Sequence, residues 1–117
     1  MLRRKQRDGR DAEDLARRHL ERQGLIPLEN NYLCRTGEID LVMREGEVLV
    51  FVEVRLRRNG AFGGALASVD RRKQQRLISA AQHYLQRTAW TGPCRFDVVG
   101  MDGSGTPQWI RNAFEAI

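Results

Sequence analysis

Residues 37–57, GEIDLVMREGEVLVFVEVRLR, decide the fold of this chain. They read as two strands joined by a tight turn at residues 44–47, where Gly46 supplies the backbone freedom that hairpins need. The second strand, residues 48–55, carries a run of Val, Leu and Phe without hydrophobic alternation. Such a run indicates burial on both faces, and therefore a central position in the sheet.

The hairpin holds two acids in strand-like surroundings, Asp40 and Glu53, and Arg55 follows two residues after the second acid. A carboxylate is costly to bury unless it is paired, hydrogen-bonded or bound to a metal. Because side chains alternate along a strand, Glu53 and Arg55 share one face, roughly 7 Å apart. The sequence therefore predicts a functional site on this hairpin if Asp40 reaches the same face.

The register of the hairpin decides whether Asp40 joins Glu53. In one register, Arg44 pairs with Glu47 across a two-residue loop and Asp40 lies diagonal to Glu53; in a second register, Asp40 faces Glu53 directly. Both registers put the two acids on one face, whereas a loop one residue longer would separate them. The sequence leaves the register open, and the common two-residue hairpin favours the shared face.

Acids on neighbouring strands repel one another, and a divalent cation would neutralise that repulsion. Carboxylate oxygens suit Mg²⁺ or Mn²⁺, which can lower the pKa of a bound water and polarise a phosphate oxygen. Arg55 could stabilise charge on the phosphate, but a guanidinium cannot act as the general base. The alternative is an edge hairpin with solvated acids and an ordinary Glu–Arg surface pair. The spacing alone does not decide between the two, and the burial expected for residues 48–54 favours the metal site.

The charge balance favours a polyanionic partner. Lys and Arg total 20 against 15 Asp and Glu, which gives a net charge of +5, and 18 of the 20 cations are arginine. Guanidinium groups match phosphate oxygens well, so we expect nucleic acid as the partner, although a compositional bias of the source genome would give the same excess. The two cysteines and two histidines show no metal-ligand spacing.

We expect residues 1–117 to form a single domain, with residues 1–7 as a mobile basic arm. Hydrophobic residues make up 41% of the chain, which is typical of a globular protein. No run approaches the roughly 20 apolar residues that span a bilayer, and no apolar segment of a signal peptide follows the basic start. We therefore expect a cytoplasmic protein without a membrane partner.

Periodicity and turn residues predict the order α-β-β-β-α-β, typical of an α/β sandwich around a mixed sheet. The first helix is expected from residue 8 or 11 to residue 23, and the second from Ser68, as N-cap, to residue 87. Strands are expected at residues 25–32 (an edge strand, because of Pro27), 37–43, 48–55 and 95–101, with a further strand possible at 108–111.

Several segments spread over the chain resemble one protein family. They are GRDAEDLARRHL, GEIDLV, VFVEVRLR, the FGG loop followed by SVDRRKQQRL, and the closing FDVV and NAF. The chain resembles the YraN family of small bacterial proteins, of the restriction-endonuclease-like PD-(D/E)xK superfamily and related to archaeal Holliday-junction resolvases. The resemblance implies a restriction-endonuclease-like mixed β-sheet flanked by helices.

The resemblance also implies roles for individual residues. Asp40 would be the first metal-binding acid and Glu53 the second, and Arg55 stands where the superfamily usually has lysine. Glu13 in the first helix matches an accessory catalytic acid of the resolvase-like branch; its alternative interpretation is an i,i+4 pair with Arg17. The arginine at position 55 puts the water-activation step in doubt without removing the metal site.

The expected function is that of a Mg²⁺- or Mn²⁺-dependent endodeoxyribonuclease acting on branched or structured DNA. The alternatives are a catalytically inactive nucleic-acid-binding module of the same fold and a protein-interaction subunit whose basic surface meets an acidic partner. A homodimer would match a two-fold junction. The residues expected to bind nucleic acid are Arg57, Arg58, Arg71, Arg72, Lys73 and Gln74.

Overall fold

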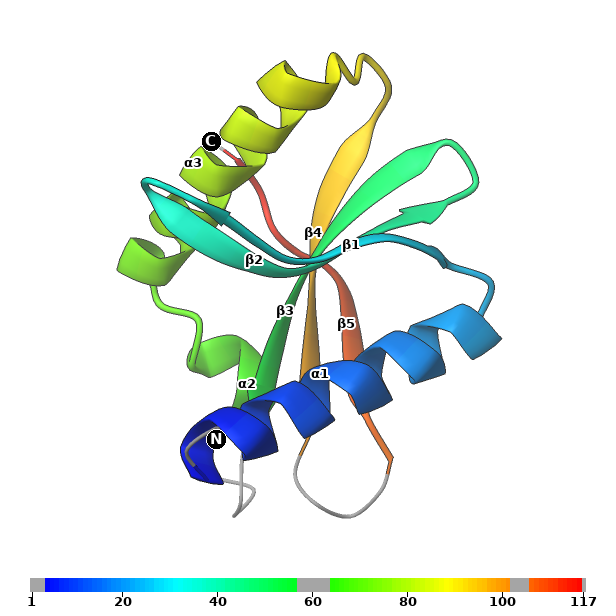
Figure 1. The fold of residues 1–117 in the computed structure, drawn as a ribbon, viewed down its shortest axis with the longest axis vertical. Helices are drawn as coiled ribbons and strands as arrows, with labels where there is room; N and C mark the ends of the chain where they lie inside the picture. The colour runs from blue at the N-terminus through cyan, green and yellow to red at the C-terminus, as the bar shows by residue number, and fades with distance from the viewer. Residues whose placement is uncertain (1–3, 57–63, 102–105, 117) are drawn as a thin grey trace.

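A computed structural model describes residues 4–56, 64–101 and 106–116 of the chain (Figure 1). The elements in chain order are α1 (Arg4–Arg22), β1 (Ile26–Cys34), β2 (Gly37–Glu45), β3 (Val48–Leu56), α2 (Gly64–Ala67), α3 (Arg71–Thr88), β4 (Cys94–Met101) and β5 (Gln108–Phe114). One five-stranded sheet has the order β1-β2-β3-β4-β5, in which only β3 and β4 run parallel. The predicted mixed α/β architecture is confirmed, with α2 and the full length of β5 as additions.

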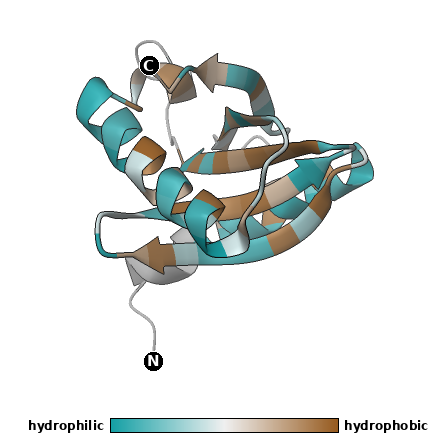
Figure 2. Cartoon of the chain, turned by 90° about the horizontal axis from the view of Figure 1, so that it is seen from above, coloured by the Kyte–Doolittle hydropathy of each residue, from teal (hydrophilic) through white to brown (hydrophobic). Residues whose placement is uncertain are grey.

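The sheet lies between two helices that cover opposite faces. Ala12, Ala16 and Leu20 of α1 pack on one face, and the apolar side of α3 packs on the other. Figure 2 shows that hydrophobic segments are concentrated in the strands. None of the helices in the described part of the chain is long and apolar enough to cross a membrane.

Strand β3 occupies the centre of the sheet, as its continuous apolar run predicted. Leu49 and Phe51 pack on the α3 side, while Val50 and Val52 pack on the α1 side. All four side chains are at most 1% exposed. The prediction that β3 is buried on both faces is therefore confirmed, and so is the edge position of β1.

The hairpin between β2 and β3 has a two-residue loop. Glu45 pairs with Val48 across Gly46 and Glu47, and Gly46 adopts a φ of 60°, a conformation that glycine adopts at little cost. The pairing runs back to Leu41 opposite Val52. This is the second of the two expected registers, the one in which Asp40 would face Glu53, and the ladder itself ends at Leu41 and Val52.

Two helix starts differ from the expectations. Helix α1 begins at Arg4, so residues 4–7, expected in a mobile basic arm, lie in the helix; the strong helix formers there allow the extension. Helix α3 begins at Arg71 with Asp70 as its N-cap, whose carboxylate accepts from the Lys73 amide at 2.8 Å. Ser68, the expected cap, instead donates its hydroxyl to the Ala65 carbonyl at 2.6 Å.

Candidate functional site

Strands β1 and β2 both exchange faces at one point. Asn30 and Leu41 pair on the side of α1, whereas the next pair along, Tyr32 and Ile39, packs with the α3-side core. The register is unchanged across the switch, so Asn31 stands opposite Asp40. Asn31 has a φ of 51°, a left-handed conformation that asparagine tolerates better than most residues. This switch point is where the site is built.

Asp40 turns toward β3 at the place where the two strands part. The β2–β3 pairing ends at Leu41 and Val52, and the Val54 amide donates to Asp40 Oδ2 at 2.8 Å. The carboxylate thus takes up an amide of the central strand just beyond the end of the ladder. This bond fixes the Asp40 side chain between β2 and β3.

Three acids from two elements converge beside Asp40. Carboxylate oxygens of Glu13, Glu38 and Asp40 lie within 4.8 Å of one another. Asn31 Nδ2 donates to Glu13 Oε1 at 2.7 Å, which ties α1 to β1. The structure therefore brings the expected accessory acid Glu13 to Asp40 and adds Glu38.

The alternative interpretation of Glu13, an ion pair with Arg17, is wrong for the described residues. Arg17 contacts Asp14 at 3.5 Å and Glu21 at 3.2 Å on its own helix. Asn31 is the site residue that the sequence reasoning missed. Its signal was two consecutive asparagines inside an expected strand, where asparagine is depleted.

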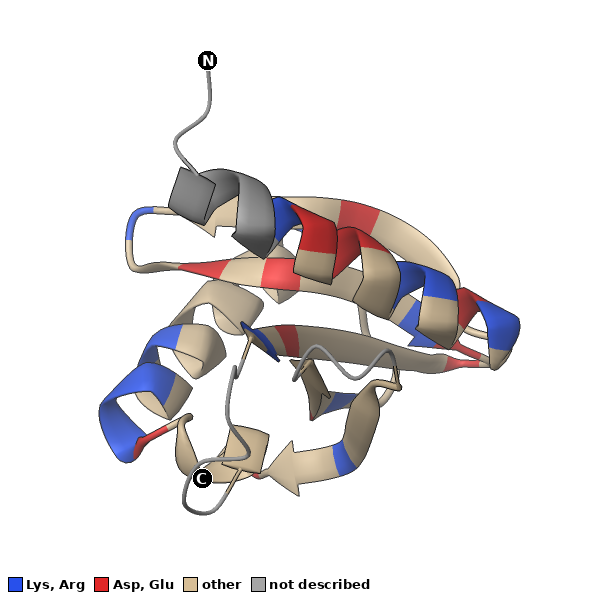
Figure 3. Ribbon diagram, turned by 90° about the horizontal axis from the view of Figure 1, so that it is seen from below, with Lys and Arg blue, Asp and Glu red and all other residues tan. Residues whose placement is uncertain are grey.

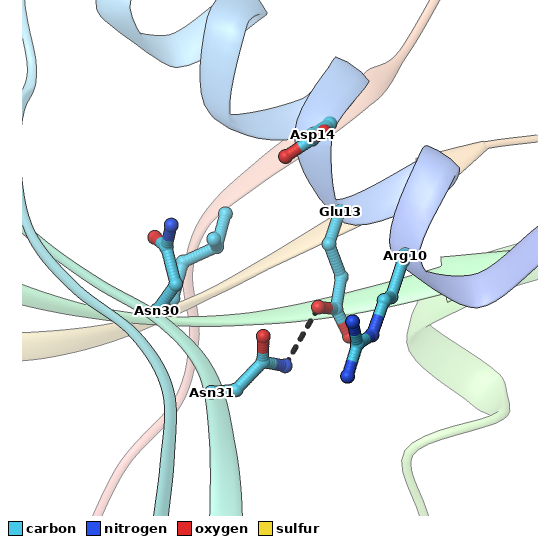
Figure 4. Close-up of a pocket in the computed structure, with 6 residues that line it drawn as sticks. Arg10, Glu13, Asp14, Asn30 and Asn31 are labelled. Carbon is cyan, nitrogen blue, oxygen red and sulfur yellow. Dashed lines mark hydrogen bonds between the residues drawn. The ribbon is translucent and has the colours of Figure 1, made fainter. Parts of the chain in front are cut away.

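A cavity of about 320 Å³ opens beside these acids, between α1 and β1. Figure 4 shows Arg10 and Glu13 projecting from α1 toward the strand that carries Asn30 and Asn31. Asp14 and Leu41 complete the lining. Because the lining is mostly polar, a hydrated ion or a polar ligand can approach Glu13 from this side.

Glu53 completes the site from the opposite strand, and its environment is unusual. Its side chain is 4% exposed, and its Oε1 has no hydrogen-bond partner within the described residues. Buried polar atoms in native proteins are nearly always partnered, so an exception needs an explanation. A proton shared with the adjacent Asp40 is one such explanation, and a ligand that contacts the carboxylate is another.

Asp97 provides the contrast, since it is the other buried acid of the described residues. Arg95 donates to both of its oxygens, at 2.9 and 3.1 Å, and the Trp109 indole and the Asn112 amide add two bonds of 2.9 Å. This full set of donors makes Asp97 a structural residue that joins β4 to β5. Glu53 has no comparable set of donors among the described residues.

Two cations approach the other oxygen of Glu53. Arg55 Nε lies 3.4 Å from Glu53 Oε2, and Lys73 Nζ from the first turn of α3 lies 3.6 Å from the same atom. Arg55 also donates through Nη2 to the Ser68 carbonyl at 3.2 Å. The expected neighbourhood of Glu53 and Arg55 is thus present, and Lys73 joins it from the start of α3.

Two carboxylates of the site, Glu53 and Glu13, have raised pKa values. Burial, together with the adjacent Asp40 carboxylate, raises the pKa of Glu53 from 4.5 to about 8, against the opposing charges of Lys73 and Arg55. Burial also raises the pKa of Glu13 to about 7; the Asn31 bond opposes this rise, and Asp40 and Glu38 add to it. Without a cation the site therefore retains protons near neutral pH.

The residues expected to bind nucleic acid are only partly placed. Arg57 and Arg58 lie outside the described residues. Arg71 and Arg72 are exposed in the first turn of α3. Figure 3 shows these basic positions on α3 apart from the acidic segments of α1 and the neighbouring strands. Gln74 Nε2 donates to the Val69 carbonyl at 3.0 Å, which anchors the start of the helix.

The donor set fits a hard divalent cation. Asp40 belongs to the group of acids with Glu13 and Glu38, and it also contacts Glu53. All four side chains offer carboxylate oxygens, the ligands that Mg²⁺ and Mn²⁺ prefer. A bound cation would offset their mutual repulsion and give Glu53 Oε1 a partner.

Comparison with known proteins identifies relatives over nearly the whole chain. The model of the family described as "Uncharacterised protein family UPF0102" matches residues 12–101. A UPF0102 protein of Pseudomonas fluorescens is 52% identical over 117 residues, covering 95% of both chains. One from Pseudomonas aeruginosa is 56% identical over 115 residues, covering 92% of each, and one from Stutzerimonas stutzeri is 57% identical over 116 residues, covering 95% of this chain and 97% of the relative. The chain therefore belongs to the UPF0102 family, the YraN family of the sequence analysis.

Proposed function

We propose that this chain is a divalent-cation-dependent nuclease that hydrolyses phosphodiester bonds in branched or structured DNA, on a sheet of the restriction-endonuclease-like type. One observation carries the proposal: Asp40 lies at the meeting point of acids from α1, β2 and β3. The buried Glu53 among them has an oxygen without a partner in the described residues. A purely structural carboxylate, such as Asp97, has its donors within the protein.

The acids and the arginine of the site have different roles in this proposal. Asp40 and Glu53 hold Mg²⁺ or Mn²⁺, with Glu13 and Glu38 as further oxygen donors. When bound, the ion lowers the pKa of a water and polarises a phosphate oxygen. Arg55 donates hydrogen bonds to the phosphate as negative charge builds on its oxygens, and it accepts no proton because guanidinium stays charged in proteins.

Basic residues near the site hold the DNA backbone. The exposed Arg71 and Arg72 at the start of α3 contact phosphates without reading sequence, and Arg57 and Arg58 are assigned the same role from sequence alone. Each such contact releases condensed counterions, so affinity falls steeply with salt. A flat response between low and physiological salt would remove nucleic acid as the main partner.

A cleavage assay tests the function directly. Labelled junction, flap, single-stranded and duplex DNAs, together with an RNA, are incubated with Mg²⁺ or Mn²⁺. Wild type should cut at least one DNA, whereas Asp40→Asn should not, and DNA affinity should be similar for both. Glu47→Gln, which removes an exposed carboxylate at the hairpin loop, is the matched control and should cut as wild type does.

A second candidate function is a nucleic-acid-binding module without turnover. It is favoured by Arg55, which stands where the resembled superfamily usually has lysine and which cannot exchange a proton. Salt-sensitive DNA binding without cleavage of any substrate would select this module. If DNA binding is absent as well, a protein-interaction subunit remains. Light scattering with and without a junction tests the proposed homodimer.

A further inference from the structure

Lys73 and Arg55 approach one carboxylate oxygen from two different elements. Their nitrogens lie 3.6 and 3.4 Å from Glu53 Oε2, which the strand β3 supplies. The Lys73 and Arg55 side chains remain 32% and 27% exposed, whereas the Glu53 side chain is 4% exposed. The two cations therefore separate the buried acid from solvent and are themselves open to it.

The segment before α3 holds both cations in place. Arg55 Nη2 donates to the Ser68 carbonyl at 3.2 Å. Two residues later, Asp70 caps α3 by accepting from the Lys73 amide, which fixes the position of Lys73 in the first turn of the helix. Gln74 fastens the same turn to Val69. The pair is thus built by local hydrogen bonds rather than by chance contact of long side chains.

The pair has unused capacity for an anion. The Arg55 side chain is 27% exposed, so a ligand can reach the outer part of its guanidinium, while its buried Nε faces Glu53 Oε2 at 3.4 Å. The Lys73 contact of 3.6 Å is longer than the roughly 2.7–2.9 Å of a charge-assisted hydrogen bond, and an ammonium has three donors. Both groups can therefore donate to a ligand while they stay next to Glu53.

We infer that Lys73 and Arg55 together form the subsite for the reacting phosphate, which makes Lys73 a second catalytic cation. The inference rests on the proposed function, and it separates Lys73 from the exposed arginines beside it. Four carboxylates and two cations carry a net charge of −2, which one divalent ion would neutralise. Lys73 thus adds, from a helix, a compact ammonium next to the arginine of β3.

A charge-deletion cycle between protein and DNA tests this inference. Binding is measured in Ca²⁺, a hard cation with oxygen ligands, on DNAs that carry a single neutral methylphosphonate moved stepwise along the strand. At one linkage the methylphosphonate should weaken wild-type binding by about tenfold, the loss of one charge-assisted contact. Lys73→Met should bind ordinary DNA about tenfold more weakly and lose nothing further at that linkage, because both changes remove the same contact.

Arg72→Met is the matched control, since it removes a neighbouring exposed cation of the same helix turn. Its effect should add to that of the methylphosphonate at the same linkage. Wild type should also cut at that linkage in Mn²⁺, with kcat reduced about 100-fold by Lys73→Met and largely restored in Lys73→Arg. Lys73→Gln serves as a second variant if Lys73→Met does not fold.

Additive losses for Lys73 at every linkage would overturn the inference while leaving the nuclease proposal intact. The nuclease proposal fails separately if wild type cuts no DNA in Mn²⁺. Absence of DNA binding by wild type would overturn both.

Discussion

Glu53→Gln in the metal-free protein is the sharpest test of the buried acid. Burial and Asp40 raise the pKa of Glu53 to about 8 in the folded state, against 4.5 for the ordinary group. The folded protein therefore binds a proton that the unfolded chain has already released. As pH rises from about 5 to 8, the free energy of unfolding should fall, because the folded state must give up this proton. Glutamine imitates the protonated form and cannot titrate.

The size of the effect follows from the shift. One pKa unit corresponds to about 1.4 kcal/mol, so the rise of Glu53 corresponds to roughly 3 kcal/mol of stability lost between pH 5 and pH 8. A small domain has about 5–15 kcal/mol of stability in total, so the loss is readily measured. Glu13 titrates in the same direction with a pKa of about 7, so the variant should keep a shallower decline.

Urea unfolding in EDTA at several pH values between 5 and 8 measures this change. Wild type should lose stability steadily, and Glu53→Gln should lose about 3 kcal/mol less over the same range. Glu47→Gln, at the exposed hairpin loop, should follow the wild-type curve. Parallel curves for Glu53→Gln and wild type would mean that Glu53 titrates as an ordinary solvated acid, and the argument from its burial would be refuted.

Three further predictions concern the same site. Asp40→Asn should raise the melting temperature of the metal-free protein slightly and lose most of the stabilisation that Mn²⁺ gives wild type. Scanning fluorimetry across Mn²⁺ concentrations would detect both changes. An unchanged melting temperature together with an unchanged Mn²⁺ response would contradict the interpretation that the clustered acids repel one another and bind the ion. Arg55→Lys should retain most single-turnover cleavage and Arg55→Ala should lose about one to three orders of magnitude, whereas equal losses would mean that the guanidinium fork itself is required. Asn31→Ala should destabilise the protein by about 1–2 kcal/mol and weaken Mn²⁺ binding, because it removes the hydrogen bond to Glu13 and places alanine in a left-handed conformation. Asn30→Ala is the control. Equal effects of the two substitutions would mean that Asn31 has no special role.

The fold could be predicted well where local chemistry dominates. The apolar run of β3 predicted its central position in the sheet. Gly46 predicted a tight hairpin loop, and the register of that hairpin brings Asp40 towards Glu53. The start of α3 was less readable, because both Ser68 and Asp70 are good N-caps and only the tertiary position of the loop selects Asp70.

The site could be predicted only as far as its strands. The contact of Lys73 with Glu53 joins a helix to a strand across the loop between them, and no sequence pattern encodes that distance. The bond from Asn31 to Glu13 depends on a face exchange in β1 that breaks the period of two on which strand prediction rests. Both contacts arise from packing of remote segments rather than from local preference.

The irregularities of β1 also affect the tendency of this protein to aggregate through its sheet edge. An edge strand offers unpaired amides and carbonyls to any passing strand, and β1 adds the exposed Leu28 and Leu33 to that risk. Pro27 has no amide hydrogen to offer, a register shift follows between Pro27 and Glu29, and the left-handed Asn31 turns the remainder to the other face. No long, flat stretch of edge is left for a foreign strand to extend. Asn31, which positions the site acid Glu13, therefore also disfavours aggregation through this edge of the sheet.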